Sequence, residues 1–135
     1  MIAVDTSVIV AAFATWHDQH DVAIRSLAGD RVSPSHVVLE TYSVLTRLPS
    51  PHRVPSGIAM SYLETTFPRD RIIYPSSDAI AGLPRRCHEA GLSGGATYDA
   101  VVGVTCLEHD AELLTLDRRS LRNHQALGVS ARLVA

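Results

Sequence analysis

Four acidic side chains stand where this sequence could assemble a metal-dependent site. Asp5 and Asp117 each follow a short apolar run, while Glu40 and Asp99 lie in segments whose apolar residues have helical spacing. Carboxylate oxygens suit Mg²⁺ and Mn²⁺ as ligands. A metal ion held by such groups can activate water and stabilise the leaving oxygen of a phosphodiester, so this chemistry requires no His, Cys or Ser nucleophile.

Two apolar runs position the first and the last of these acids. The run at residues 1–4 is typical of a strand that is buried on both faces of a parallel sheet. Asp5 then lies at the carboxyl end of that strand, which is the edge where ligands bind in open α/β sheets. The run at residues 111–116 repeats the pattern and places Asp117 at the same edge.

The other two acids belong to predicted helices. Glu40 lies in a helix predicted over residues 36–48, where it is either a metal ligand or the ion-pair partner of Arg47 on the same face. Asp99 lies in the first turn of a helix predicted over residues 98–107, where the helix dipole alone favours an acid. If the acids converge, each pair about 4 Å apart repels by roughly 4 kcal/mol at an effective dielectric of about 20, and a divalent cation relieves that repulsion.

Strands and helices alternate along the chain, which predicts one α/β domain over residues 1–135 with helices on both faces of a parallel sheet. Thr6 or Ser7 is the expected cap of the first helix, and Ser35 the expected cap of a later one. Three prolines in residues 49–55 indicate a protruding loop. The other predicted elements are helices over 22–28, 56–63, 79–90 and 118–128, and strands over 31–34, 71–75 and 131–134.

The polar stretch after the first helix contains the single tryptophan of the chain. Trp16, His17 and His20 either flank a substrate groove or form a loop with one partly buried aromatic ring, and the loop is the simpler interpretation.

Composition narrows the function classes. Hydrophobic residues make up 46% of the 135 residues, so a sizeable core is expected. The net charge of −2 gives no global signature of nucleic-acid binding, so a nuclease would need a local basic patch. All 12 basic residues are arginine, which excludes any mechanism that requires lysine. Two unclustered cysteines indicate a reducing cytoplasm, and no targeting segment or membrane-spanning run is found.

Several catalytic patterns are absent. The sequence has no HExxH, no GxSxG and no Cys/His spacing for zinc. A phospho-acceptor receiver domain would need an acidic pair after the first strand and a lysine after the last. A phosphatase with an Asp nucleophile would need an Asp-x-Asp pair, whereas Asp5 is followed by Thr6 and Ser7.

Four segments of the sequence carry a combined signal. They are Val4-Asp5-Thr6-Ser7-Val8, Glu40 in the helix after Ser33-Pro34-Ser35, Leu92-Ser93-Gly94-Gly95 leading to Tyr98-Asp99-Ala100, and Leu114-Thr115-Leu116-Asp117. In their order, their spacing and the chain length, these segments resemble the PIN-domain ribonucleases, and specifically the VapC toxins of bacterial type II toxin–antitoxin pairs.

The resemblance implies a PIN-like three-layer α/β/α sandwich with about five parallel strands. It implies that an acidic quartet binds Mg²⁺ or Mn²⁺, with Asp5 and Asp99 as core ligands and Glu40 and Asp117 completing the site. Thr6 and Thr115 would bond to the carboxylates or to the water of the metal.

The resemblance also implies an activity and partners. The protein would be a cytoplasmic, metal-dependent endoribonuclease toxin that hydrolyses structured RNA, such as loops of tRNA or rRNA. It would form a homodimer, and a cognate antitoxin would neutralise it. The segment around residues 49–63 would form a protruding clip. Two alternatives remain open: an inactive PIN-fold binding module, and a PIN ribonuclease of RNA processing outside toxin–antitoxin systems.

Overall fold

A five-stranded parallel sheet lies at the centre of the protein. The computed structural model describes residues 1–134, and Ala135, the last residue of the predicted domain, lies outside them. The strands run in the order β3-β2-β1-β4-β5, so β1 is central and pairs with β2 through Ala3 and Val32 and with β4 through Ala3 and Leu113. The strands are β1 (Ile2–Val4), β2 (Arg31–Pro34), β3 (Ile72–Ile73), β4 (Glu112–Thr115) and β5 (Ala131–Leu133).

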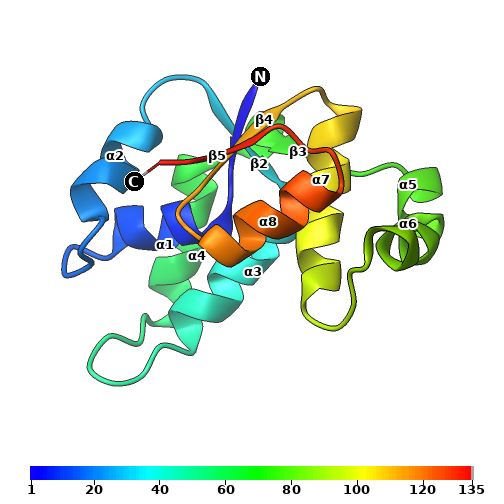
Figure 1. The fold of residues 1–135 in the computed structure, drawn as a ribbon. Coiled ribbons are helices and arrows are strands. Elements are labelled where there is room, and N and C mark those ends of the chain that lie inside the picture. Colours follow the sequence, from blue (N-terminus) through cyan, green and yellow to red (C-terminus); the bar gives the residue numbers. More distant parts are fainter. Residues whose placement is uncertain (135) are drawn as a thin grey trace.

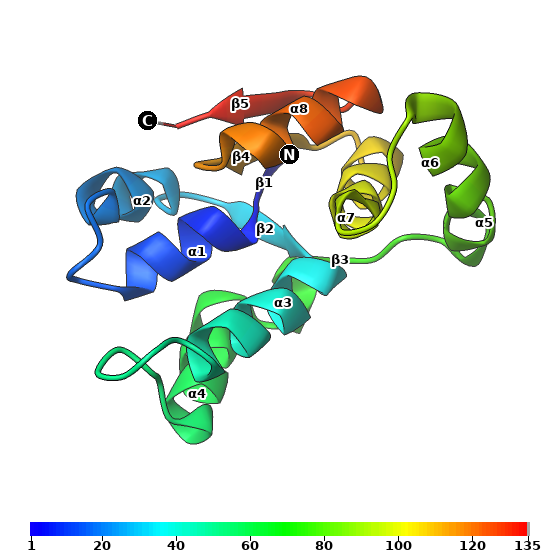
Figure 2. The ribbon, with the colours of Figure 1, turned by 60° about the horizontal axis from the view of Figure 1, so that its bottom comes forward.

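Helices cover both faces of the sheet, which confirms the predicted sandwich. Because crossovers between parallel strands are right-handed, the steps from β1 to β3 place their helices on one face and the steps through β4 to β5 place theirs on the other. Figure 2 shows α1, α2 and α4 on one side of the strands and α5, α6 and α7 on the opposite side. The helices are α1 (Thr6–Phe13), α2 (His20–Ser26), α3 (Ser35–Thr46), α4 (Ser56–Thr66), α5 (Ser77–Ala81), α6 (Leu83–Ala90), α7 (Ala96–Glu108) and α8 (Arg118–Ala126), with a 3₁₀ turn at Arg69–Arg71.

The main core lies between the sheet and these helices. Ala3 and Val4 of β1 and Leu113 and Leu114 of β4 are fully or almost fully buried. Helix α7 is largely buried, since six of its residues, from Ala100 to Cys106, are buried. Within residues 1–134, no helix is both long enough and apolar enough to cross a membrane.

A second, smaller core lies under the α3–α4 hairpin. Leu45, Val54 and Ala59 are buried together there, apart from the main cluster. The hairpin and its Pro-rich loop project from the body of the molecule, at the bottom of Figure 1, as predicted for this segment. Tyr62 anchors the hairpin to α1, because its hydroxyl donates to the Ile9 carbonyl at 3.2 Å.

One predicted helix and two predicted helix caps were wrong. The helix predicted over residues 79–90 is broken at Gly82, because Pro84 lacks an N–H and is accommodated only in the first turn of a new helix. The predicted caps also differ, since the cap of α1 is Asp5 and Ser35 is already the first residue of α3. Both helices therefore begin earlier than predicted: Asp5, directly after β1, is the N-cap of α1, and Pro34, the last residue of β2, is the N-cap of α3.

Candidate active site

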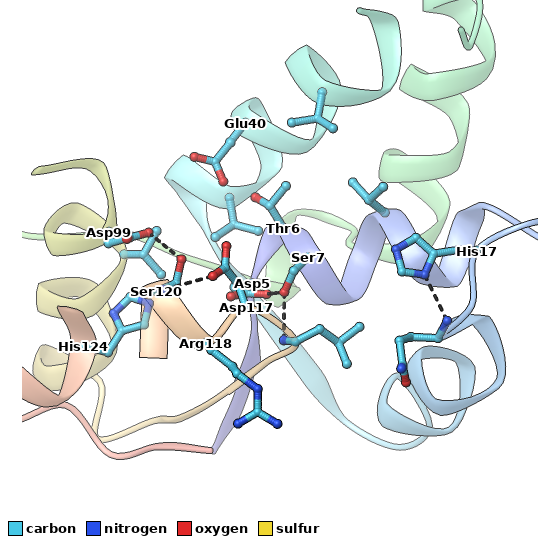
Figure 3. A pocket seen from close by; sticks show the side chains of 16 residues that line it. Asp5, Thr6, Ser7, His17, Glu40, Asp99, Asp117, Arg118, Ser120 and His124 are labelled. Atoms are coloured by element: carbon cyan, nitrogen blue, oxygen red, sulfur yellow. Dashed lines mark hydrogen bonds between the residues drawn. The ribbon is translucent and has the colours of Figure 1, made fainter. Parts of the chain in front are cut away.

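The four predicted acids line a single cavity at the carboxyl edge of the sheet. The cavity has a volume of about 540 Å³ and lies between α1, α3, α7 and α8. Figure 3 shows Asp5 and Asp117 at its centre, with Glu40 above them and Asp99 to one side. Apolar side chains form part of the remaining wall, and the other lining residues are polar or basic: Thr6, Ser7, His17, Gln19, Arg118, Ser120 and His124.

Asp5 is the buried centre of the cavity. It follows β1 directly, is only 7% exposed, and caps α1 by accepting a hydrogen bond from the backbone N–H of Val8 at 3.3 Å. Burial raises the pKa of this carboxyl from 3.8 to about 6, although hydrogen bonds from Ser7 and Val8 act in the opposite direction. Asp5 therefore carries its charge at neutral pH at a considerable desolvation cost.

Ser7 connects Asp5 to the end of β4. Its hydroxyl donates to Asp5 Oδ1 and accepts from the backbone N–H of Leu116 at 2.9 Å. The Thr115 hydroxyl lies 3.3 Å from Ser7 Oγ. Because a serine has a single hydroxyl proton and Asp5 receives it, Thr115 must be the donor in that contact. Two strands are thus joined by side chains at the point where their acids enter the cavity.

Asp117 stands at the exposed side of the cavity. Its Oδ1 caps α8 by accepting from the backbone N–H groups of Arg119 at 2.8 Å and Ser120 at 3.2 Å. The backbone N–H of Asp117 in turn donates to Thr115 Oγ1 at 3.0 Å. Asp117 Oδ1 therefore caps α8, whereas Oδ2 takes no part in the cap.

Asp99 is held by α8 from across the cavity. Ser120 Oγ donates to Asp99 Oδ1 at 3.2 Å, and Asn123 Nδ2 donates to Oδ2 at 2.8 Å. Ser120 and Asn123 are three residues apart on one helix and therefore face the same way. Asp99 thus has side-chain partners beyond the helix dipole of α7.

Glu40 is half-buried and is paired with a histidine. His36 Nε2 lies 3.7 Å from Glu40 Oε2, one helical turn earlier on α3. Hydrogen bonding by His36 is the main cause that lowers the pKa of this carboxyl, and burial acts against it. The alternative ion pair with Arg47 does not form within residues 1–134, because Arg47 donates instead to Ser43 Oγ at 3.3 Å.

The donor set of the cavity fits a divalent cation of the Mg²⁺ type. All four acids offer carboxylate oxygens, and Thr6 Oγ1 is buried beside them without a hydrogen-bond partner. A buried orphan hydroxyl is costly unless water or an ion completes its shell. As the side chains stand, no three His, Cys, Asp or Glu groups in residues 1–134 are close enough to share one ion. The acids therefore surround the cavity rather than touch one another.

Sequence reasoning missed the roles of several residues that surround the acids. Ser7, Ser120 and Asn123 each bond directly to an acid, and His124 is 1% exposed against the same wall. Burial lowers the pKa of His124, which keeps its ring neutral. Polar residues at positions 120 and 123–124 of a predicted helix have the spacing of one face, and that spacing was the available signal.

Comparisons with known proteins place this architecture in a family. The family model described as "PIN domain" matches residues 2–126. The chain is 44% identical over 136 residues to Ribonuclease VapC40 of Mycobacterium tuberculosis, covering 99% of each chain. The chain belongs to the VapC group of the PIN-domain family. A second VapC relative, Ribonuclease VapC27 of the same species, is 36% identical and covers 95% of this chain and 93% of its own.

Solved structures share the VapC fold at low sequence identity. FitAcB of Neisseria gonorrhoeae superposes with a TM-score of 0.71 at 17% identity, covering 97% of this chain and 96% of its own. VapC20 of M. tuberculosis, described as a sarcin–ricin loop cleaving toxin, gives 0.71 at 18% identity, with coverages of 90% and 94%. VapBC2 of Rickettsia felis, bound to a promoter DNA fragment, gives 0.67 at 15% identity and covers 98% of each.

Proposed function

We propose that this VapC-group protein is a metal-dependent endoribonuclease and the toxin of a VapBC-type toxin–antitoxin pair, acting in the cytoplasm. The observation that carries the proposal is the cavity lined by Asp5, Glu40, Asp99 and Asp117, which come from four separate elements. Sequence identities of 44% and 36%, over nearly the whole chain, to two proteins named as ribonucleases support the same reaction for this chain.

Each acid has a distinct part in the proposed site. Asp5 and Asp99 would be the principal ligands of Mg²⁺ or Mn²⁺, while Glu40 and the free oxygen of Asp117 would hold its water. When bound, such an ion supplies a Lewis acid that lowers the pKa of water and offsets charge on the phosphodiester. The unpartnered Thr6 hydroxyl would orient that water, and Ser7, Ser120 and Asn123 fix the carboxylates.

Local basic groups would bind the phosphate backbone. Arg118 lines the cavity, and Arg119 lies beside Asp99 and Asp117 in an adjoining hollow. Both follow the Asp117 cap on the first turn of α8, so they supply positive charge where the net charge of −2 gives none. The proposed substrate is a structured RNA loop, the class of target named for VapC20.

A protein partner and a second copy complete the proposal. The likeness to VapBC and FitAB assemblies supports a cognate antitoxin that covers the acidic cavity.

A homodimer is favoured by an apolar groove of about 360 Å³, where Leu39 and Tyr74 are exposed by 67% and 57%. Sedimentation of the wild type and of Leu39→Asp checks the dimer, since the charged variant should be monomeric.

The deciding experiment is cleavage of end-labelled total RNA by the purified protein with Mg²⁺, Mn²⁺ or EDTA. We expect discrete fragments with either metal, none with EDTA, and none from Asp99→Asn. Fragments that persist in EDTA or with Asp99→Asn would refute the proposed site. Absence of cleavage together with absence of metal binding in calorimetry would favour an inactive binding module.

A further inference from the structure

Two exposed aromatic rings beside the acidic cavity have no role in the proposed chemistry. Trp16 is 50% exposed and Tyr98 is 57% exposed. Each is stacked on a histidine from a different part of the chain. Single exposed apolar residues need no explanation, but paired rings at both sides of a polar cavity form a repeated arrangement.

The first pair joins two loops. The rings of Trp16 and His52 are stacked with centroids 4.0 Å apart and an interplanar angle of 29°. Trp16 lies between α1 and α2, and His52 lies in the Pro-rich loop between α3 and α4. Backbone hydrogen bonds fix both loops, from His17 N–H to the Ala14 carbonyl at 3.0 Å and from His52 N–H to the Pro49 carbonyl at 2.9 Å. The surface is therefore formed in advance of binding.

The second pair joins α3 and α7. The rings of His36 and Tyr98 are parallel within 5°, with centroids 5.6 Å apart. Tyr98 precedes Asp99, and His36 is the residue that pairs with Glu40. This stack therefore borders two of the four acids.

The two stacks lie on different sides of the acids. His17, which follows Trp16 and has its ring 5.9 Å from the indole, lines the cavity. Figure 3 shows His17 and Asp99 on opposite sides of Asp5. Trp16 directly precedes His17 in the chain and Tyr98 directly precedes Asp99, so the two stacks belong to opposite walls of the acidic centre. A strand that crosses the centre would meet one stack before the acids and the other after them.

We propose that the Trp16–His52 and Tyr98–His36 stacks are base platforms that hold unpaired nucleotides on the two sides of the scissile phosphate. This inference rests on the proposed ribonuclease function and names the form of RNA that the site takes. Unpaired bases stack on Trp, Tyr and His rings with little regard to sequence, whereas the bases of a duplex are already stacked on one another. The platforms therefore select single-stranded segments, while the acids between them cut.

The single tryptophan of the chain makes the first platform directly observable. Asp5→Asn protein, chosen to prevent cleavage, is titrated with a short single-stranded RNA of mixed sequence while Trp16 fluorescence is recorded. We expect saturable quenching with this RNA, and none with its duplex or with an RNA of the same length made entirely of abasic nucleotides. Saturable binding by filter retention without any quenching would overturn the Trp16 platform.

Kinetics test both platforms in active protein. Trp16→Leu and Tyr98→Leu should each raise KM for single-stranded RNA about tenfold with little change in kcat, whereas Trp16→Phe and Tyr98→Phe should stay near the wild type. Ile24→Ala is the matched control, because Ile24 is 48% exposed on α2 away from the cavity. Unchanged KM in both leucine variants, with RNA still cleaved, would refute the platforms and leave the nuclease intact. No cleavage and no RNA binding by the wild type would refute both proposals.

Discussion

Asn123 Nδ2 donates a 2.8 Å hydrogen bond to Asp99 Oδ2, so α8 determines how an acid on α7 faces the cavity. Loss of a group that orients a metal ligand typically lowers metal affinity or activity by about 10- to 100-fold. We predict that Asn123→Ala lowers kcat for RNA cleavage and weakens Mg²⁺ binding by about tenfold or more. Gln125→Ala, on an exposed part of the same helix, should change neither. Equal activity of the two variants in the same assay would contradict this role.

The buried carboxyl of Asp5 predicts how stability without metal depends on pH. Its folded-state pKa of about 6 lies above its ordinary 3.8, so the native state holds the proton more tightly than the unfolded state. The free energy of unfolding should therefore fall as pH rises from 3.8 to about 6. In Asp5→Asn this fall should be absent, and the variant should be more stable above that range by up to about 3 kcal/mol.

Thermal unfolding in EDTA at several pH values measures this difference. Asp21→Asn, an exposed carboxylate of α2, is the control and should follow the wild type. A steeper loss of stability with pH in Asp5→Asn than in the wild type would argue against a buried, charged Asp5.

The same proton competes with a metal ion. A cation bound at Asp5 must displace the proton, so below a pH of about 6 the affinity should weaken by close to tenfold per pH unit. Calorimetric titration with Mg²⁺ across this range gives the slope. An affinity that stays constant well below the pKa of Asp5 would mean that the ion binds elsewhere.

We predict that removal of the Ser7 hydroxyl destabilises the junction of β1 and β4. Ser7→Ala removes the donor to Asp5 Oδ1 and leaves the Leu116 N–H without its acceptor. Loss of a partner to a part-buried polar group costs about 1–3 kcal/mol, so the melting temperature should fall. Ser61→Ala, at an exposed position of α4, should leave it unchanged. A melting temperature for Ser7→Ala equal to that of Ser61→Ala would disprove the link.

Gly103 of α7 packs closely against α8 and the segment that follows it. A Cβ at this position would stand 3.0 Å from Val129 Cγ2 and 3.3 Å from His124 Nδ1. Gly103→Ala should therefore destabilise the protein by about 1–3 kcal/mol and displace α8 from Asp99.

Gly57 provides the matched control for that substitution. A Cβ on Gly57 in α4 would meet nothing within 4 Å, so Gly57→Ala should slightly stabilise its helix. Comparison of melting temperature and RNA cleavage for the two alanine variants tests the packing. Equal melting temperatures would show that α7 and its neighbours tolerate a methyl group.

Much of this architecture could be predicted because its signals are local. The apolar runs before Asp5 and Asp117 specify strands, and their carboxyl ends necessarily meet at one edge of a parallel sheet. The contacts that orient the acids were not predictable in this way. Ser7 bonds to a residue 109 positions away, and Asn123 bonds to one 24 positions away, so neither appears in any local pattern.

Pairing choices within one helix were equally hard to predict. Both His36 and Arg47 lie within two helical turns of Glu40, and only the full geometry shows that His36 is the partner. The break at Gly82 was in principle readable from Pro84, two residues later.

The separate core of the α3–α4 hairpin has a consequence for how such proteins diversify. Leu45, Val54 and Ala59 support the loop that carries His52, and they pack against Val10 and Phe13 of α1 rather than against the buried residues of the sheet. Insertions or substitutions in that loop can therefore accumulate while the sheet and its carboxylates stay unchanged. Under the proposed division of labour, a lineage could acquire a new RNA target by remodelling a peripheral module and inherit the cutting machinery intact.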